Sequence, residues 1–216
     1  AIGGKTGVNL PGDKNLVGAF HQPSLVICDS AVLQSLPKEN FSDGIAEAVK
    51  YGAIADRALF ELLESGSCED RMDYLISSCV VIKKRLVEED ERDTGRRMLL
   101  NFGHTLGHAI ESITHYQQYR HGQAVAVGMV LMTQASERAG ISPPGTAKRL
   151  ELVLKRHALP TTTDLPLDRL ISFCLADKKR MGDTLQLAVL SDIGEASLLR
   201  VPVDRLERFL LHGVTV

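Results

Sequence analysis

The chain has 216 residues, of which 44% are hydrophobic and 24% charged, and its formal net charge at pH 7 is −2. This length allows a sizeable core in one domain, or in one domain with a small appendage. The near-neutral charge, with no apolar run of transmembrane length and no signal peptide, argues against a nucleic-acid or membrane partner. The four cysteines form no CxxC pair and are typical of reduced cytosolic thiols.

Most of the chain has helical patterns. Residues 1–23 are rich in turn residues and are expected to be loop, whereas 24–29 (SLVICD) favours a short strand. TLQLAVLSDIGEASLLRV alternates around an IGE turn and predicts a hairpin or two short strands. Together these patterns predict a mainly α fold, a helical bundle with little β structure. Apolar periodicity predicts helices over 42–55, 57–64, 69–91, 95–115, 121–139, 143–157, 167–176 and 203–212.

The segment RRMLLNFGHTLGHAIES holds the densest set of chemical side chains. Arg97, Asn101, His104 and His108 are spaced i, i+4, i+7 and i+11, which places them in one stripe along a continuous helix. The opposite side is apolar and predicts a packing face. Two glycines flank the row, which indicates that something approaches the backbone closely. A plain polar surface is the alternative, but Arg, Asn and two His favour a metal or substrate site.

Other candidate residues lie on the neighbouring helices. Lys83 falls on the apolar face of 69–91, so it must extend to solvent or meet an anion. Glu47 and Lys50 are three residues apart, as in a simple ion pair. His121 comes just before a helix, where a lone histidine is usually a cap or surface residue. GGKT, GDKN and DKKRMGD add lysines beside flexible backbone or at a helix end, a weak indication of phosphate binding.

Histidines, a carboxylate and surplus cations suit a metal with an open coordination position beside an anionic substrate. The HxxxH spacing of His104 and His108 lacks the glutamate of HExxH, which excludes a zincin protease.

Several strings occur in one order between residue 2 and about residue 195: GGKTGVNLPGDKNLVGAFHQP, SLP, GIAEAVKYG, EEDERDTGRRMLLNFGHTLGHAIE, HGQAVAVGM and DKK…G…L. Their combination resembles the C-terminal, metal-binding part of 3-dehydroquinate synthases, within the sugar-phosphate cyclases. The resemblance implies the second step of the shikimate pathway, in which a seven-carbon sugar-acid phosphate (DAHP) loses phosphate and closes to a carbocycle. It also implies NAD and Zn²⁺ or Co²⁺ as cofactors, a homodimer and a cytoplasmic location.

The resemblance carries roles onto single residues. It implies metal ligands at Glu47, His104 and His121, and a proton-handling role for His108. Further catalytic or substrate contacts are implied at Lys50, Lys83, Arg97, Asn101, Lys178, Lys179, Lys5 and Asn15. The implied cofactor-binding residues are Lys5, Lys14, Val32, Leu33, Gln34 and Ser35.

Two departures from the family pattern affect the expectations. Gln123 follows His121–Gly122 where the family has Glu, which is expected to weaken the hydrogen bonding around the metal histidine, although Gln keeps an acceptor oxygen. The glycine-rich NAD-binding half is absent, and the chain opens AIGGKTGVNLPGDKN without an initiator Met. We therefore expect a fragment of a two-domain enzyme: residues 1–38 belong to the NAD-binding domain and 39–216 form the α-helical metal- and substrate-binding domain.

Three alternatives stay open at this point. A related cyclase could make 2-deoxy-scyllo-inosose or a valiolone precursor with the same metal ligands. A metal-dependent polyol dehydrogenase of the same architecture should lack the lysines around Lys50 and Lys83. A non-catalytic relative would fit a decayed site at Gln123, but the intact histidines, Glu47 and cations argue against it.

Overall fold

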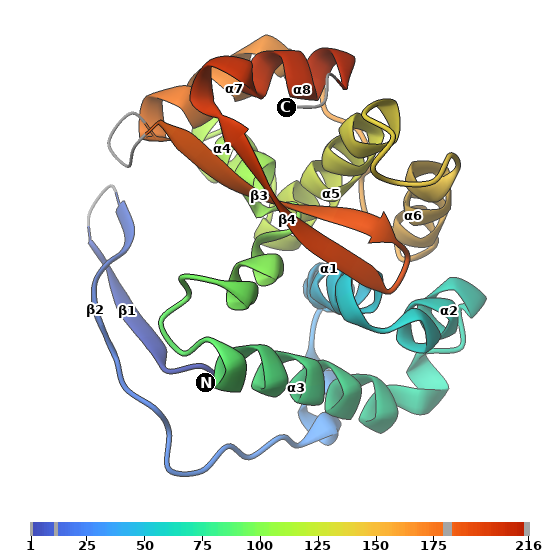
Figure 1. The fold of residues 1–216 in the computed structure, drawn as a ribbon. Coiled ribbons are helices and arrows are strands. Elements are labelled where there is room, and N and C mark those ends of the chain that lie inside the picture. The colour runs from blue at the N-terminus through green and yellow to red at the C-terminus, as the bar shows by residue number, and fades with distance from the viewer. Residues whose placement is uncertain (1, 11–12, 179–182, 214–216) are drawn as a thin grey trace.

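The computed structural model describes residues 2–10, 13–178 and 183–213, which form a mainly helical fold with two small antiparallel sheets (Figure 1). The α-helices are α1 (Lys38–Ala55), α2 (Arg57–Ser65), α3 (Met72–Glu89), α4 (His104–Ile113), α5 (His121–Arg138), α6 (Thr146–Arg156), α7 (Leu167–Lys178) and α8 (Leu206–His212). Four 3₁₀ helices connect them: η1 (Ser30–Ser35), η2 (Glu69–Arg71), η3 (Arg96–Asn101) and η4 (Val203–Arg205). The strands are β1 (Lys5–Leu10), β2 (Asp13–Phe20), β3 (Thr184–Asp192) and β4 (Glu195–Pro202). The predicted fold class is confirmed.

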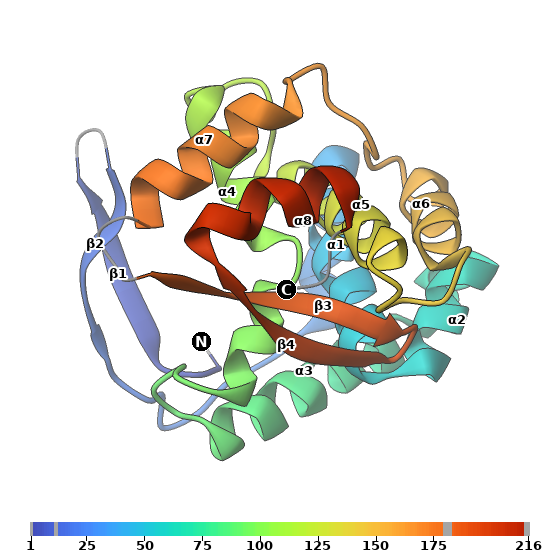
Figure 2. The same ribbon diagram turned by 45° about the horizontal axis from the view of Figure 1, so that its top comes forward.

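Helix α5 lies at the centre of the core. It packs against α1, α4, α6 and α8, and the β3–β4 hairpin covers α1, α5 and η3 from one side (Figures 1 and 2). Almost every residue of α5 from Gly122 to Met132 is buried, and most of these side chains are small. Small side chains let neighbouring backbones come close, so α5 can bring α1 and α4 to its own N-terminus. No helix in the described ranges is long and apolar enough to cross a membrane.

The predicted hairpin at the C-terminal end is confirmed, but the N-terminal predictions were wrong. Residues 5–10 and 13–20 are not loop: β1 pairs antiparallel with β2, with Lys5 opposite Phe20. Glycine, asparagine and lysine are weak strand formers, so the pairing overrides local propensity. The run 24–29 forms no strand, and Leu25 and Ile27 are 74% and 82% exposed. A β-favouring run needs a neighbouring strand to pair with, and none of the described strands pairs with it.

The predicted helix over 95–115 is broken. Residues 96–101 are 3₁₀ helix, and α4 begins only at His104. Between them Gly103 has φ +78°, and a Cβ atom there would lie 2.4 Å from Met129 Cγ and 2.7 Å from the Val125 carbonyl oxygen. The close approach that the sequence indicated at Gly103 is therefore made by α5, which packs directly against the Gly103 backbone. Glycine suits this position because it has no Cβ and tolerates a positive φ. The remaining predicted helices are present, with ends shifted by a few residues.

Candidate metal centre and substrate pocket

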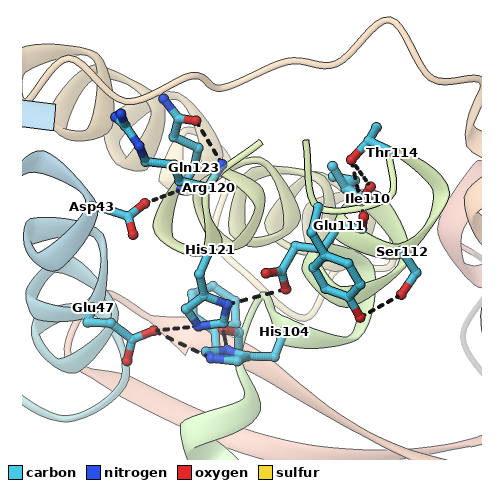
Figure 3. Close-up of polar contacts among 12 residues, drawn as sticks. Asp43, Glu47, His104, Ile110, Glu111, Ser112, Thr114, Arg120, His121 and Gln123 are labelled. Carbon is cyan, nitrogen blue, oxygen red and sulfur yellow. Dashed lines mark hydrogen bonds and ion pairs between the residues drawn. The ribbon is translucent and has the colours of Figure 1, made fainter. Parts of the chain in front are cut away.

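Three side chains from three helices converge at one point. Glu47 lies in the middle of α1, and His104 and His121 are the first residues of α4 and α5. The Nε2 atoms of His104 and His121 lie 3.4 and 3.8 Å from Glu47 Oε1, and the three ligand atoms all lie within 4.8 Å of one another (Figure 3). The structure thus brings together the three residues for which the sequence suggested metal ligation.

The hydrogen bonds of the two imidazoles determine which nitrogen faces this point. His104 Nδ1 lies 3.1 Å from the Phe102 carbonyl oxygen, and His121 Nδ1 lies 3.3 Å from Glu111 Oε2. Carbonyl and ionised carboxylate oxygens only accept, so in both rings Nδ1 carries the hydrogen and donates it. Each Nε2 therefore faces Glu47, and in the neutral ring it offers a lone pair there. The hydrogen bond to Glu111 raises the pKa of His121, against the opposing effect of burial.

The arrangement fits a divalent cation. Two imidazole Nε2 atoms and a carboxylate oxygen face one another, and Glu47 Oε1 is buried without a hydrogen-bond partner among the described residues. Ligands bound at about 2.1 Å in a tetrahedron are roughly 3.4 Å apart, close to the observed 3.4 and 3.8 Å. Burial alone would raise the pKa of Glu47, but His104 and the Lys50 ammonium hold it well below its usual range, so the carboxylate is ionised.

Two contacts between α1 and α5 fix the position of Glu47 relative to His121. Asp43, one turn before Glu47, accepts a hydrogen bond from the Gln123 backbone N–H at 3.1 Å (Figure 3). A Cβ atom at Gly122 would lie 2.2 Å from the Asp43 carbonyl oxygen, so only glycine fits where the helices meet. The start of α5 is thereby anchored on α1 directly beside the candidate metal ligands.

A pocket of about 240 Å³ adjoins Glu47 and His104. Lys50 is buried at 3% exposure and donates to Glu47 Oε2 at 2.7 Å. Lys83 is half-buried, and its pKa is lowered by burial and by the positive charge of Lys50. Such a concentration of cations suits a ligand that carries carboxylate or phosphate groups. The walls of the pocket comprise Lys5, Glu47, Lys50, Tyr51, Lys83, Asp93, Arg97, Leu100, Asn101 and His104.

Arg97 has a structural role that the sequence did not indicate. Its side chain is buried, and it donates hydrogen bonds to the carbonyl oxygens of Glu91 at 2.7 Å and Gly3 at 2.9 Å. The guanidinium therefore ties the start of the chain to the loop before η3, while it also lines the pocket. His108 lies beside the candidate metal ligands, with its ring centroid 5.5 Å from that of His104 and 6.0 Å from that of His121.

Some predicted site residues lie elsewhere or outside the description. Val32 to Ser35 form part of η1, and Leu33 and Gln34 line a separate pocket of about 770 Å³. Lys14 and Asn15 lie in β2 and Lys178 ends α7, but only their backbone is described. Lys179 lies outside the described residues.

Sequence reasoning missed two carboxylates of the site. Asp93 lines the pocket and forms an ion pair with Lys5. Glu111, buried on α4, contacts His121. The sequence could have indicated Glu111 by its spacing. Glu111 follows His104 by seven residues and His108 by three, so it lies on the same face of the helix.

Comparison with known proteins identifies the family. The model of the 3-dehydroquinate synthase C-terminal region matches residues 44–180, and that of the N-terminal region matches residues 1–43. The chain belongs to the 3-dehydroquinate synthase family. Among its relatives, a 3-dehydroquinate synthase of Clostridium acetobutylicum is 42% identical and one of Streptococcus suis 41% identical, each over 97% of this chain. The chain spans 60–61% of the length of these relatives.

Two solved structures have the same fold. A 2-deoxy-scyllo-inosose synthase in complex with carbaglucose-6-phosphate, NAD⁺ and Co²⁺ gives a TM-score of 0.77 at 26% identity, covering 96% of this chain and 61% of that one. A 2-epi-5-epi-valiolone synthase from Streptomyces hygroscopicus, with NAD⁺ and Zn²⁺ bound, gives 0.79 at 24% identity, covering 98% and 61%. The shared fold extends over almost the whole chain.

The departure at Gln123 has a local explanation in this member of the 3-dehydroquinate synthase family. Its side-chain Oε1 accepts a hydrogen bond from the Arg120 backbone N–H at 3.0 Å and so caps the start of α5 (Figure 3). The Gln123 amide therefore uses the one feature that a Glu carboxylate would also offer, an oxygen that accepts a hydrogen bond. The carboxylate on the Nδ1 side of His121 is that of Glu111, which lies on α4.

Proposed function

We propose that this chain is the metal- and substrate-binding part of a 3-dehydroquinate synthase, which converts DAHP to 3-dehydroquinate and phosphate. The observation that carries the proposal is the convergence of Glu47, His104 and His121 beside a pocket lined by Lys50 and Lys83. Identity of about 42% to named 3-dehydroquinate synthases, against 26% to a 2-deoxy-scyllo-inosose synthase, favours DAHP over a hexose phosphate.

Under this proposal Glu47, His104 and His121 hold Zn²⁺ or Co²⁺. When bound, the metal supplies a Lewis acid and NAD a hydride acceptor. The ammonium groups of Lys50 and Lys83 and the Arg97 guanidinium bind and orient the carboxylate and phosphate of the substrate. Their burial strengthens this attraction by excluding water. Asn101 contacts the substrate from the same wall, and His108 moves a proton during phosphate elimination.

We assign residues 1–38 to the NAD-binding domain and 39–216 to the helical domain. Large apolar side chains of the first segment lie exposed, as expected of a surface that another part of a longer protein covers. Val32, Leu33, Gln34 and Ser35 would then contact the adenosine side of NAD, and Lys5, Lys14 and Asn15 the cleft between NAD and substrate. We also propose that the enzyme is a homodimer located in the cytoplasm. The exposed side chains are Val8, Leu10, Val17, Phe20, Leu25, Val26, Ile27, Val32 and Leu36.

The test uses a fused protein that joins this chain to the part of the Clostridium acetobutylicum relative that it does not match. With NAD and Zn²⁺, the fused protein should release phosphate from DAHP and form 3-dehydroquinate. Glucose 6-phosphate and sedoheptulose 7-phosphate should give no carbocyclic product. Turnover of either sugar phosphate without turnover of DAHP would replace the proposal with another cyclase activity.

A further inference from the structure

We propose that Glu111 is a positioning residue of the metal centre. Its carboxylate holds the His121 imidazole in the tautomer that has hydrogen on Nδ1, so that Nε2 is presented to the metal. The inference rests on the proposed function, because it concerns the same centre.

The contact differs from that of the other histidine. His104 is 14% exposed and donates to a backbone carbonyl within its own segment, so packing and backbone already fix its ring. The His121 side chain is 43% exposed and is the first residue of α5. Packing therefore holds this ring less firmly than that of His104, and a hydrogen bond donated to a fixed partner is needed to orient it.

Glu111 is suited to be that partner. It lies on α4, which packs closely against α5, and its side chain is only 5% exposed. Oε2 lies 3.3 Å from His121 Nδ1, and Nε2 of the same ring faces Glu47 Oε1 (Figure 3). A carboxylate behind a ligating imidazole fixes the ring and makes the nitrogen more basic, and its removal typically weakens metal binding about 10–100-fold.

A second arrangement competes with this one. The side chains of His108, Glu111 and His121 also offer ligand atoms within 4.8 Å of one another. If Glu111 ligated an ion there, His121 Nδ1 would need a lone pair instead of a hydrogen. The two arrangements predict different metal stoichiometries and different His121 tautomers.

The experiment measures Zn²⁺ affinity of the 216-residue chain by calorimetry and records the visible spectrum of bound Co²⁺. Glu111→Ala should weaken Zn²⁺ binding about 10–100-fold and alter the Co²⁺ bands. Glu111→Gln should lose less, because its amide oxygen still accepts from Nδ1. Glu137→Gln is the matched control: Glu137 accepts a hydrogen bond from the Ala147 N–H, lies about 24 Å from His121 along α5, and should bind as the wild type does.

Two further measurements show that Glu111 acts through His121. In a His121→Ala background, Glu111→Ala should cause no additional loss of affinity. In the Zn²⁺-loaded wild type, ¹H–¹⁵N NMR should show His121 with hydrogen on Nδ1 and the metal on Nε2, a measurement that needs no variant to fold.

Several results would overturn the inference. These are wild-type affinity in Glu111→Ala, an equal loss in the His121→Ala background, or a ring bound through Nδ1. Two ions per wild-type chain and one per Glu111→Ala chain would make Glu111 a ligand instead. A wild-type chain that binds no Zn²⁺ would refute the metal centre of the proposed function, a result distinct from all of these.

Discussion

Replacing Arg97 with methionine should destabilise the fold far more than replacing its neighbour Arg96. Arg97 is 3% exposed and donates two charge-assisted hydrogen bonds, to the carbonyl oxygens of Gly3 and Glu91. Each such bond contributes about 1.5–3 kcal/mol. Glu91 is exposed, so its carbonyl can turn to water, whereas Gly3 is buried and its carbonyl would lose its donor. We therefore expect Arg97→Met to lower the free energy of unfolding by about 2–4 kcal/mol.

Urea unfolding followed by circular dichroism measures this loss. With a slope of about 2–3 kcal/mol per M, the midpoint should fall by roughly 1 M. Arg96→Met is the control, because Arg96 is 65% exposed and only forms a surface ion pair with Glu89 at 3.3 Å. Arg96→Met should lower the free energy of unfolding by less than about 0.5 kcal/mol. If the two variants unfolded at the same urea concentration, the structural role of Arg97 would be refuted.

Three other predictions concern the pocket and its support. In the fused protein, Lys83→Met should keep the fold but lower turnover of DAHP about 10²–10³-fold, as for the loss of one charge-stabilising donor, whereas Lys84→Met on the exposed side should be neutral. Gly122→Ala should weaken Zn²⁺ binding in calorimetry by separating α1 from α5, whereas Gly44→Ala, where a Cβ meets nothing within 4 Å, should bind normally and be up to about 1 kcal/mol more stable. Burial raises the pKa of Asp90, but hydrogen bonds from three backbone N–H groups lower it overall. The contribution of ionised Asp90 to the free energy of unfolding is therefore present above the unfolded pKa of about 3.9 and is lost as pH falls through the folded pKa. The difference in urea midpoint between wild type and Asp90→Asn should therefore be largest near neutral pH and shrink below about pH 4, and a constant difference would contradict this assignment.

Periodicity alone predicted the helices of the bundle and the clustering of the histidines. His104 and His108 stay on one face of α4 because their i, i+4 spacing lies wholly within that helix. The apolar face opposite them is buried as expected, with Ala109 and Ile110 fully inaccessible to solvent. The ligand role of His104 and the proton-handling role of His108 came from the resemblance and stay proposals, as do the domain boundary at residue 38 and the roles of the pocket cations.

The features that sequence reasoning missed depend on contacts between distant segments. Gly103 indicated a close approach, but nothing within 95–115 shows that α5 makes it or that the helix ends there. The pairing of β1 with β2 likewise depends on register, not on the strand propensity of either segment. Propensity reports the local preference of a segment, whereas these features are decided by what packs against it.

The site lies where two helices begin, and this position explains its need for carboxylates. His104 and His121 are the first residues of α4 and α5, and the N-terminal end of a helix carries a partial positive charge. A divalent cation at this point would be disfavoured by both helix ends if its ligands were neutral imidazoles alone. Glu47 supplies one negative charge directly to the cluster, and Glu111 supplies a second behind His121. The negative charge of Glu111 acts through the His121 imidazole, because it makes the coordinating Nε2 more basic. A neutral amide keeps the acceptor oxygen but not this charge, so Glu111→Gln should fall between the wild type and Glu111→Ala.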